Sequence, residues 1–228
     1  MQSEVDGILV AAHELKSPLS LMRQLALSID ENTTDKQLAK TKSQIVNVSE
    51  RAMRQVDDLT KIANLNETLF PVEPVAVRTI CDEVISELRH LYRFNHRYLN
   101  VTYSNRSKLV IANRELLFSV IYNFCINAMH YSDEQTKSVL KISDHQDKVR
   151  IDIRDFGPSL PMDVWRELKR GWINRPTSIA MRPGSSGLGL FIASKFASYM
   201  NAPVGAIRHR DGTSFFIELP ISSQMSLI

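Results

Sequence analysis

The sequence predicts an α+β protein in which a helical hairpin precedes a two-layer α/β sandwich. Apolar residues repeat at helical spacing from residue 8 to residue 62, with a polar break at residues 31–35, and this pattern indicates two long helices. Beyond Pro71 and Pro74, helical stretches are separated from stretches of alternating apolar and polar residues, which are typical of strands exposed on one face. Helices segregated from a mostly antiparallel sheet form two layers.

The first predicted helix carries apolar residues at alternating spacings of four and three. Such a seam is typical of a helix that packs along a partner helix. We expect this helix to end near Asp30, where turn-forming and N-capping residues follow, and a second amphipathic helix to run to about Leu65. The first seam consists of Ile8, Ala12, Leu15, Leu19, Met22, Ala26 and Ile29.

The hairpin predicts self-association, because two amphipathic helices cannot enclose their own seam. A hairpin that pairs with its copy forms a four-helix bundle with twofold symmetry, so we expect a homodimer. The alternative is a hairpin that packs only on the rest of its own chain.

The remainder of the chain follows after a linker between Asn66 and Pro74, where the periodicity stops. A loop-rich region is expected at residues 156–186, and its part at 160–183 exceeds the usual loop length and predicts a lid, which Trp165 and Trp172 could fasten. The expected helices cover residues 77–94, 114–131 and 187–200, and the expected strands lie near residues 101–103, 109–111, 139–142, 149–153, 204–208 and 214–219.

Composition excludes several classes of protein. The 228 residues carry a net charge of +3, and the basic residues are scattered, which argues against a nucleic-acid partner. Cys81 and Cys125 form no CxxC pair and lie in apolar patterns, so buried, reduced thiols in a cytoplasmic protein are expected. No run reaches the length of a membrane span, and no signal peptide is evident. A helix directly after Met1 suggests a missing upstream sensor region, so the chain could be the cytoplasmic part of a membrane-anchored sensor.

His13 and Pro18 are unusual residues for the first helix. His13 follows a seam residue by one position, and about 100° of helical rotation turns it to the edge of the apolar stripe, where a phosphoryl group could reach it. Pro18 removes a backbone hydrogen bond and kinks a helix, so something other than local stability must favour it.

Asn123, Asn127 and His130 recur at spacings of four and three on one face of the helix at 114–131. Asparagine is a poor helix former, because its amide competes for backbone hydrogen bonds. Ligation of a metal and phosphates is one reason for two asparagines a turn apart. The alternative is that both asparagines are surface amides with no functional role.

Two glycine-containing stretches lie at the ends of predicted elements. Asp155 and Gly157 follow an alternating strand, and residues 184–190, GSSGLGL, open a helix whose free N–H groups favour an anion. Taken singly, Asp-x-Gly is usually a turn and a glycine cluster is usually a loop.

In this order the motifs resemble those of the two-component sensor histidine kinases. Residues 13–19, HELKSPL, resemble the H-box; residues 123–132, NFCINAMHYS, resemble the N-box; residues 155–157 match the start of the G1 box, DxGxG; and residues 184–190 resemble the G2 box. The resemblance implies a dimerisation and phosphotransfer hairpin at residues 1–66, a linker at 67–75 and an ATP-binding domain of the Bergerat (histidine kinase and Hsp90-like ATPase) fold at 76–222.

For the hairpin, the resemblance implies the chemistry of phosphotransfer. His13 would accept the γ-phosphate of ATP, and Glu14 would accept the proton of the imidazole. The phosphoryl group would then pass to an aspartate in the receiver domain of a response regulator. Ser17 stands where many relatives carry threonine or asparagine that positions water for dephosphorylating the regulator, so phosphatase activity is a further hypothesis.

For the second domain, the resemblance implies a site for ATP and Mg²⁺. Asn127, assisted by Asn123, would ligate Mg²⁺, and Asp155 would accept a hydrogen bond from the adenine amino group, which selects adenine over guanine. His130 replaces the usual lysine, and Ser159 replaces the second G1 glycine. The implied nucleotide-binding residues are Asn123, Asn127, His130, Tyr131, Asp155, Gly157, Ser185, Ser186, Gly187, Leu188, Gly189 and Thr213.

Two other functions remain open at this point. An ATP hydrolase of the same ATP-binding superfamily would resemble the second domain, but such enzymes place a glutamate base where Asn123 stands. A degenerate dimeric scaffold, which binds ATP or a partner without phosphoryl transfer, is suggested by His130, the altered G1 box and Ser17.

Overall fold

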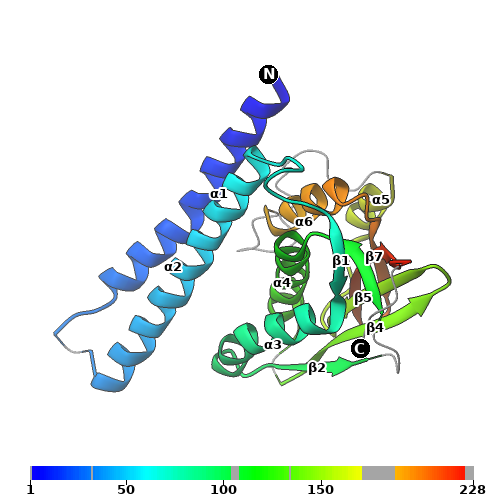
Figure 1. Ribbon diagram of the computed structural model, residues 1–228. Helices are drawn as coiled ribbons and strands as arrows, with labels where there is room; N and C mark the ends of the chain where they lie inside the picture. Colours follow the sequence, from blue (N-terminus) through cyan, green and yellow to red (C-terminus); the bar gives the residue numbers. More distant parts are fainter. Residues whose placement is uncertain (1, 32, 104–107, 134, 171–187, 224–228) are drawn as a thin grey trace. The chain divides into compact units, whose positions relative to one another are not determined.

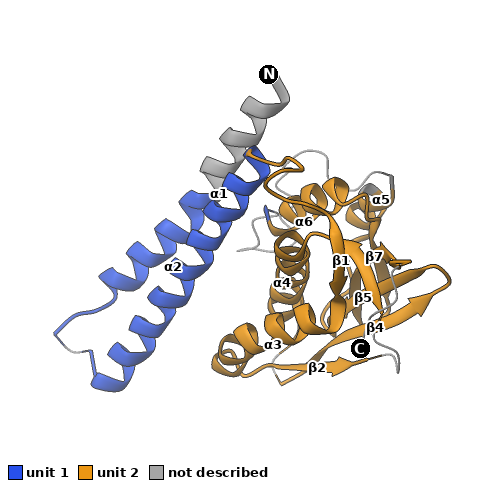
Figure 2. Ribbon diagram, viewed as in Figure 1, with its two compact units in different colours: residues 1–63, 175–188 blue, residues 64–174, 189–228 orange. Residues whose placement is uncertain are grey.

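The computed structural model describes the chain except residues 1, 32, 104–107, 134, 171–187 and 224–228, and it also leaves undescribed the side chains of residues 2–14, 167 and 170. The chain divides into two compact units, residues 1–63 with 175–188, and residues 64–174 with 189–228 (Figure 2).

Unit 1 contains the predicted hairpin, with helix α1 at Gln2–Leu27 and helix α2 at Asp35–Ala63 lying antiparallel side by side (Figure 1). Helix α1 ends three residues earlier than predicted, and Pro18 lies inside it. Before α2, Thr34 and Gln37 form a reciprocal capping box, since each side chain accepts a hydrogen bond from the backbone N–H of the other residue, at 3.0 and 3.4 Å. This box fixes where the second helix begins.

Unit 2 contains the remaining helices and strands. The bounds of two helices match the sequence prediction, because their apolar stripes and ends are unambiguous. The elements are β1 Glu73–Ala76, α3 Val77–Phe94, β2 Tyr98–Thr102, β3 Leu109–Ala112, α4 Arg114–Tyr131, β4 Lys137–His145, β5 Lys148–Arg154, α5 Met162–Arg170, α6 Leu188–Tyr199, β6 Val204–His209 and β7 Gly212–Pro220.

Five strands form a mixed sheet in the order β2-β4-β5-β7-β6. Strand β2 runs parallel to β4, and the other neighbours are antiparallel. Strands β1 and β3 pair separately in an antiparallel two-stranded sheet. Helices α3, α4 and α6 lie on one side of the five-stranded sheet (Figure 1). This is the predicted two-layer α+β architecture, with one parallel pair at the edge of the sheet.

The core of unit 2 lies between α4 and the sheet. The ring centroids of Phe124 on α4 and Phe215 on β7 are 5.8 Å apart, and both side chains are buried. Helix α4 is buried on nearly all sides, since it packs against α3 as well as against β4, β5 and β7. The predicted apolar stripe is entirely buried and consists of Leu117, Val120, Ile121, Phe124 and Ala128.

The predicted loop-rich region contains a helix that the sequence analysis missed. Helix α5 spans Met162–Arg170, and Leu168 on it is buried. Trp165 donates from its backbone to the Pro161 carbonyl at 3.0 Å, which closes the first turn. A helix of nine residues is too short for its period to stand out among the prolines around it. Trp172 and most of the predicted lid lie outside the described residues.

Both cysteines are buried in unit 2 as free thiols, as predicted. Burial raises the pKa of Cys81 and of Cys125, so both thiols stay protonated. Within the described part of the chain, no helix combines the length and apolar character that crossing a bilayer requires.

Candidate functional site

Helix α4 carries the two asparagines of the candidate site and is fixed at its start. Asn113 is the N-cap residue, and its side chain accepts a hydrogen bond from the backbone N–H of Leu116 at 3.1 Å. The same side chain donates to the Pro71 carbonyl at 2.9 Å, which attaches the segment before β1 to the start of the helix.

Further along, α4 is attached to α3 and β4 by buried polar contacts. The hydroxyl of Tyr92 on α3 donates to the carbonyl of Cys125 at 2.7 Å. At the end of the helix, the hydroxyls of Ser132 and Ser138 lie 3.0 Å apart, and both residues are buried. These contacts fix the rotation and the end of the helix, and therefore the direction in which its polar residues point.

Asn123 lies where α4 meets the start of α6. Its side chain is buried, and its amide nitrogen donates to the carbonyl of Ser119 at 2.9 Å. A Cβ on Gly189 would stand 2.9 Å from Asn123 Oδ1, closer than real Cβ atoms come, so a larger residue would require the Asn123 amide to shift. The structure thus brings a residue of the N-box against a residue of the G2 box.

Asn127 lies one turn beyond Asn123 and is partly buried. Its amide nitrogen is shielded from solvent and has no hydrogen-bond partner among the described residues. An unsatisfied buried amide is costly, and a bound ligand is one way to satisfy it. His130, one turn further, is exposed, and Tyr131 is buried.

Asp155 follows β5, and only 1% of its surface is exposed. Its carboxylate oxygen Oδ1 accepts hydrogen bonds from the backbone N–H groups of Gly157, at 3.2 Å, and Thr213, at 3.1 Å. The backbone N–H of Asp155 donates to the carbonyl of Thr213 at 2.9 Å. The carboxylate is therefore oriented by donors from two separate segments, the loop after β5 and the start of β7.

The loop after β5 packs directly against the end of α4. A Cβ on Gly157 would lie 1.7 Å from the carbonyl oxygen of Tyr131, so no side chain fits there. Gly212 has a φ of 134°, and a Cβ there would lie 2.1 Å from the carbonyl oxygen of Asp155. Both glycines permit close backbone contacts that hold the carboxylate near the end of α4.

Charged side chains surround the turn between β6 and β7. Arg154 pairs with Asp211 at 2.7 Å and lies over the ring of Phe156, 4.5 Å from its centroid. The ring nitrogen Nε2 of His209 lies 2.8 Å from the hydroxyl of Ser214. Burial, with the neighbouring Arg154 guanidinium, lowers the pKa of His209.

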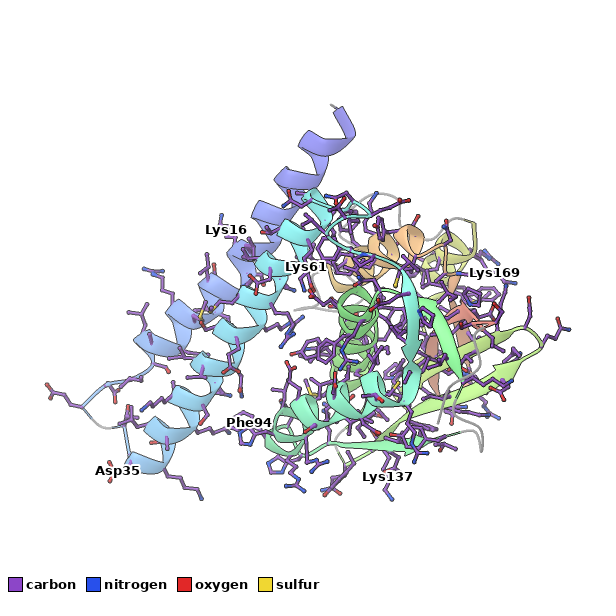
Figure 3. The ribbon with its side chains drawn as sticks, viewed as in Figure 1. Lys16, Asp35, Lys61, Phe94, Lys137 and Lys169 are labelled. Atoms are coloured by element: carbon purple, nitrogen blue, oxygen red, sulfur yellow. The ribbon has the colours of Figure 1, made fainter. Side chains whose placement is uncertain are left out.

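Several other predicted site residues lie outside the part of the chain that the structure describes. His13 and Glu14 belong to α1, but their side chains are not described, and Figure 3 accordingly draws the hairpin side chains only from the region around Lys16 onward. Ser17 is exposed on α1. Residues 185–187 are outside the described residues, whereas Leu188, which begins α6, is buried.

Unit 2 thus brings together Asn123 with Gly189, and Asp155 with Gly157 and Thr213. Sequence reasoning missed Ser119, although its i, i+4 spacing to Asn123 could have found it. It also missed the contacts of the Ser159 hydroxyl, because nothing local indicates a partner some fifty residues away. No cluster of three or more metal-binding His, Cys, Asp or Glu side chains occurs in the described part of the chain.

Comparison with known proteins places part of unit 2 in a described family. Residues 112–223 match the family described as histidine kinase-, DNA gyrase B- and HSP90-like ATPases. The match covers the segment that includes α4, the loop after β5, α6 and the closing hairpin.

Known relatives extend the likeness to the whole chain. The histidine protein kinase SaeS of Staphylococcus aureus (strain USA300) is 24% identical over 224 residues, which cover 96% of this chain and 64% of that protein. The chain therefore spans just under two thirds of the length of these curated relatives. The chain is therefore similar to the cores of two-component sensor histidine kinases, in which a helical hairpin precedes a domain of this ATPase family.

Solved structures share the fold. The Acinetobacter baumannii histidine kinase AdeS has a TM-score of 0.63 at 14% identity, covering 92% of this chain and 98% of that one. The histidine kinase ThkA in complex with the response regulator protein TrrA has a TM-score of 0.64 at 18% identity, covering 92% and 60%. Full-length ShkA in complex with AMPPNP has a TM-score of 0.63 at 18% identity, covering 99% and 47%.

Proposed function

We propose that this chain transfers the γ-phosphate of ATP to His13 and then to an aspartate of a response regulator. The observation that carries the proposal is the contact between Asn123 and Gly189, because it joins the N-box helix to the helix opened by the G2 box. The oriented carboxylate of Asp155 and the unsatisfied amide of Asn127 also support the proposal.

The residues of unit 2 fit a nucleotide. The carboxylate of Asp155, held at Oδ1 by two backbone donors, is a fixed acceptor for the amino group of adenine. The free backbone N–H groups at the start of α6 would favour the phosphate oxygens of a bound nucleotide. Tyr131 and Thr213, which contact Gly157 and Asp155 through their backbones, are buried.

The amides of α4 fit Mg²⁺ bound to phosphates. An asparagine offers a carbonyl oxygen to a cation and N–H groups to phosphate oxygens, and a hard cation prefers such oxygen ligands. Asn127 would hold the ion, and Asn123, whose amide nitrogen is committed to Ser119, would assist with its oxygen. When bound, Mg²⁺ neutralises charge that develops on the transferred phosphoryl group.

The chemical step would use the hairpin. A ring nitrogen of His13 attacks the γ-phosphorus, the bond from the γ-phosphorus to the bridging oxygen breaks, and ADP leaves. Glu14 accepts the proton from the other ring nitrogen, which keeps the attacking nitrogen nucleophilic. His130 is exposed and stands where relatives carry lysine. A histidine is not always charged as a lysine is, so it would attract phosphate less strongly.

We also infer that the hairpin forms a homodimer. Large apolar side chains on both of its helices face solvent, including Leu19 at 59%, Leu27 at 69% and Met53 at 64% exposed. Such a surface on a helical pair is typical of a self-complementary interface. The complex of ThkA with TrrA supports a response regulator receiver domain as the second partner.

The domain boundaries belong to the same proposal: the dimerisation and phosphotransfer hairpin at residues 1–66, the linker at 67–75 and the ATP-binding domain at 76–222. Swinging of the ATP-binding domain about this linker would bring the γ-phosphate to His13.

One experiment separates this function from ATP hydrolysis. The protein is incubated with ATP and Mg²⁺, and phosphate bound to protein is measured beside phosphate released into solution. A kinase labels the protein to no more than about one phosphoryl group per chain, with little free phosphate. Multiple turnovers into free phosphate without labelled protein would instead indicate a hydrolase, and neither product would indicate a scaffold.

Ser17 is proposed to position water for dephosphorylating the regulator. Its exposed position on α1, one turn after His13, is consistent with this role. The rate of regulator dephosphorylation is compared between unaltered protein and Ser17→Ala, and equal rates would remove Ser17 from the proposal.

A further inference from the structure

Ser159 stands where the DxGxG pattern has its second glycine. The backbone of Ser159 does not adopt a positive φ, so the conformation of this loop does not require glycine. Its hydroxyl donates to the carbonyl oxygen of His209 and lies 3.0 Å from that of Arg210. The side chain that departs from the motif therefore makes a specific contact some fifty residues away.

The contact joins the two segments that orient Asp155. One backbone donor to its carboxylate, Gly157, lies in the same loop as Ser159, and the other, Thr213, follows the turn that contains the two carbonyls bound by Ser159. The hydroxyl of Ser159 therefore fixes one donor relative to the other.

A second tie runs in the opposite direction. The Nε of Arg208 on β6 donates to the carbonyl of Leu160 at 2.8 Å. The loop thus both donates to and accepts from the β6–β7 hairpin, which restricts sliding of the loop along the hairpin. Both ties join the loop that contains Gly157 to the hairpin that contains Thr213.

We propose that Ser159 is a positioning residue for purine selection. The inference rests on the proposed nucleotide site and deepens it. A carboxylate distinguishes the amino group of adenine from the carbonyl of guanine only while it cannot turn away from the mismatched base. The Ser159 hydroxyl holds the loop against the hairpin, and thereby keeps the Asp155 carboxylate in one orientation.

Substitutions at position 159 distinguish the effect of the hydroxyl from that of the motif glycine. Restoring the second glycine with Ser159→Gly removes the tie, so the chain with the more typical motif should select adenine less well. Ser159→Ala removes the hydroxyl without adding the backbone freedom of glycine, and Ser159→Thr keeps the hydroxyl.

The test measures binding of ADP and of GDP, each with Mg²⁺, by calorimetric titration of the full chain. Loss of one hydrogen bond predicts that the preference for ADP over GDP falls about three- to tenfold in Ser159→Ala and Ser159→Gly. Ser159→Thr should retain most of the preference. Ser43→Ala is the matched control, because its hydroxyl also donates to a backbone carbonyl, that of Ala39 at 3.0 Å, in the other unit.

The ratio of the ADP affinity to the GDP affinity distinguishes a positioning role of Ser159 from a purely structural one. If Ser159 were only structural, its substitution would lower the melting temperature and weaken the binding of ADP and GDP equally. The preference for ADP would then be unchanged, and that result would overturn the proposal. Asp155→Asn tests the nucleotide site itself. If Asp155→Asn loses ADP binding while Ser159→Ala keeps the preference for ADP over GDP, the positioning role of Ser159 is rejected and the nucleotide site is retained. Absence of ADP binding by the unaltered protein would reject both.

Discussion

Replacing Gly157 with alanine should weaken ADP binding as well as destabilise the fold. The new Cβ would lie 1.7 Å from the carbonyl oxygen of Tyr131, and because this neighbour is backbone, rotation of a side chain cannot relieve the overlap. The loop must move away from α4. The backbone N–H of Gly157 would then leave Oδ1 of Asp155, which is now 3.2 Å away.

The magnitude follows from these two effects. Overpacking costs about 1–3 kcal/mol of folding free energy, and alanine returns about 0.4–1 kcal/mol by restricting the unfolded chain. A hydrogen bond to a charged group contributes about 1.5–3 kcal/mol, so its loss should reduce ADP affinity at least about tenfold. Urea unfolding measures the first quantity, and calorimetric titration with ADP measures the second.

Gly205→Ala is the matched control for this prediction. The added Cβ would lie 2.2 Å from the ring of Phe216, which is a side chain and not backbone. Phe215 faces the core, so Phe216, the next residue of the strand, points to the opposite face of the sheet. This variant should lose stability and keep its affinity for ADP. The reasoning is refuted if Gly157→Ala binds ADP as the unaltered protein does, or if Gly205→Ala weakens ADP equally.

Three further predictions concern the supports of the site and its pH dependence. Ser132→Ala removes one buried contact of the Ser138 hydroxyl and should cost about 0.5–1.5 kcal/mol in urea unfolding; unchanged stability would show that this contact does not support the end of α4. Tyr92→Phe loses the bond to the Cys125 carbonyl and should cost about 0.5–1.5 kcal/mol in the same assay, with full stability as the contrary result. Because the pKa of His209 is lowered in the folded state, its contribution to stability is present above the ordinary histidine pKa and is lost as the pH falls through the lowered value. His209→Gln should flatten that acid dependence, and an unchanged slope in unfolding free energy against pH would count against it.

Most of the fold could be predicted because local patterns dominate it. The helices at Val77–Phe94 and Arg114–Tyr131 were predicted with their observed bounds, since each has a clear apolar stripe and a clear end. The strand at Lys148–Arg154 was predicted from its alternation, and its inward side chains are buried. The parallel pairing of β2 with β4 could not be predicted, because pairing depends on contacts between strands that no local pattern records.

Candidate residues could be singled out where the residue type is unusual for its place. Asn123 and Asn127 stand out because amides inside a helix require a reason, whereas Asp155 was singled out only by the resemblance of residues 155–157 to the G1 box. The contacts that orient them did not stand out. The approach of Gly157 to Tyr131 depends on how two elements pack, and single residues do not indicate such a distance.

The most direct test of the account is phosphorylation of His13. The protein is incubated with γ-labelled ATP and Mg²⁺ beside His13→Gln, and the label is challenged with acid and with alkali. We predict that the unaltered protein acquires an acid-labile, alkali-stable label and that His13→Gln acquires none. An unlabelled unaltered protein, or a label that persists in His13→Gln, would contradict the account.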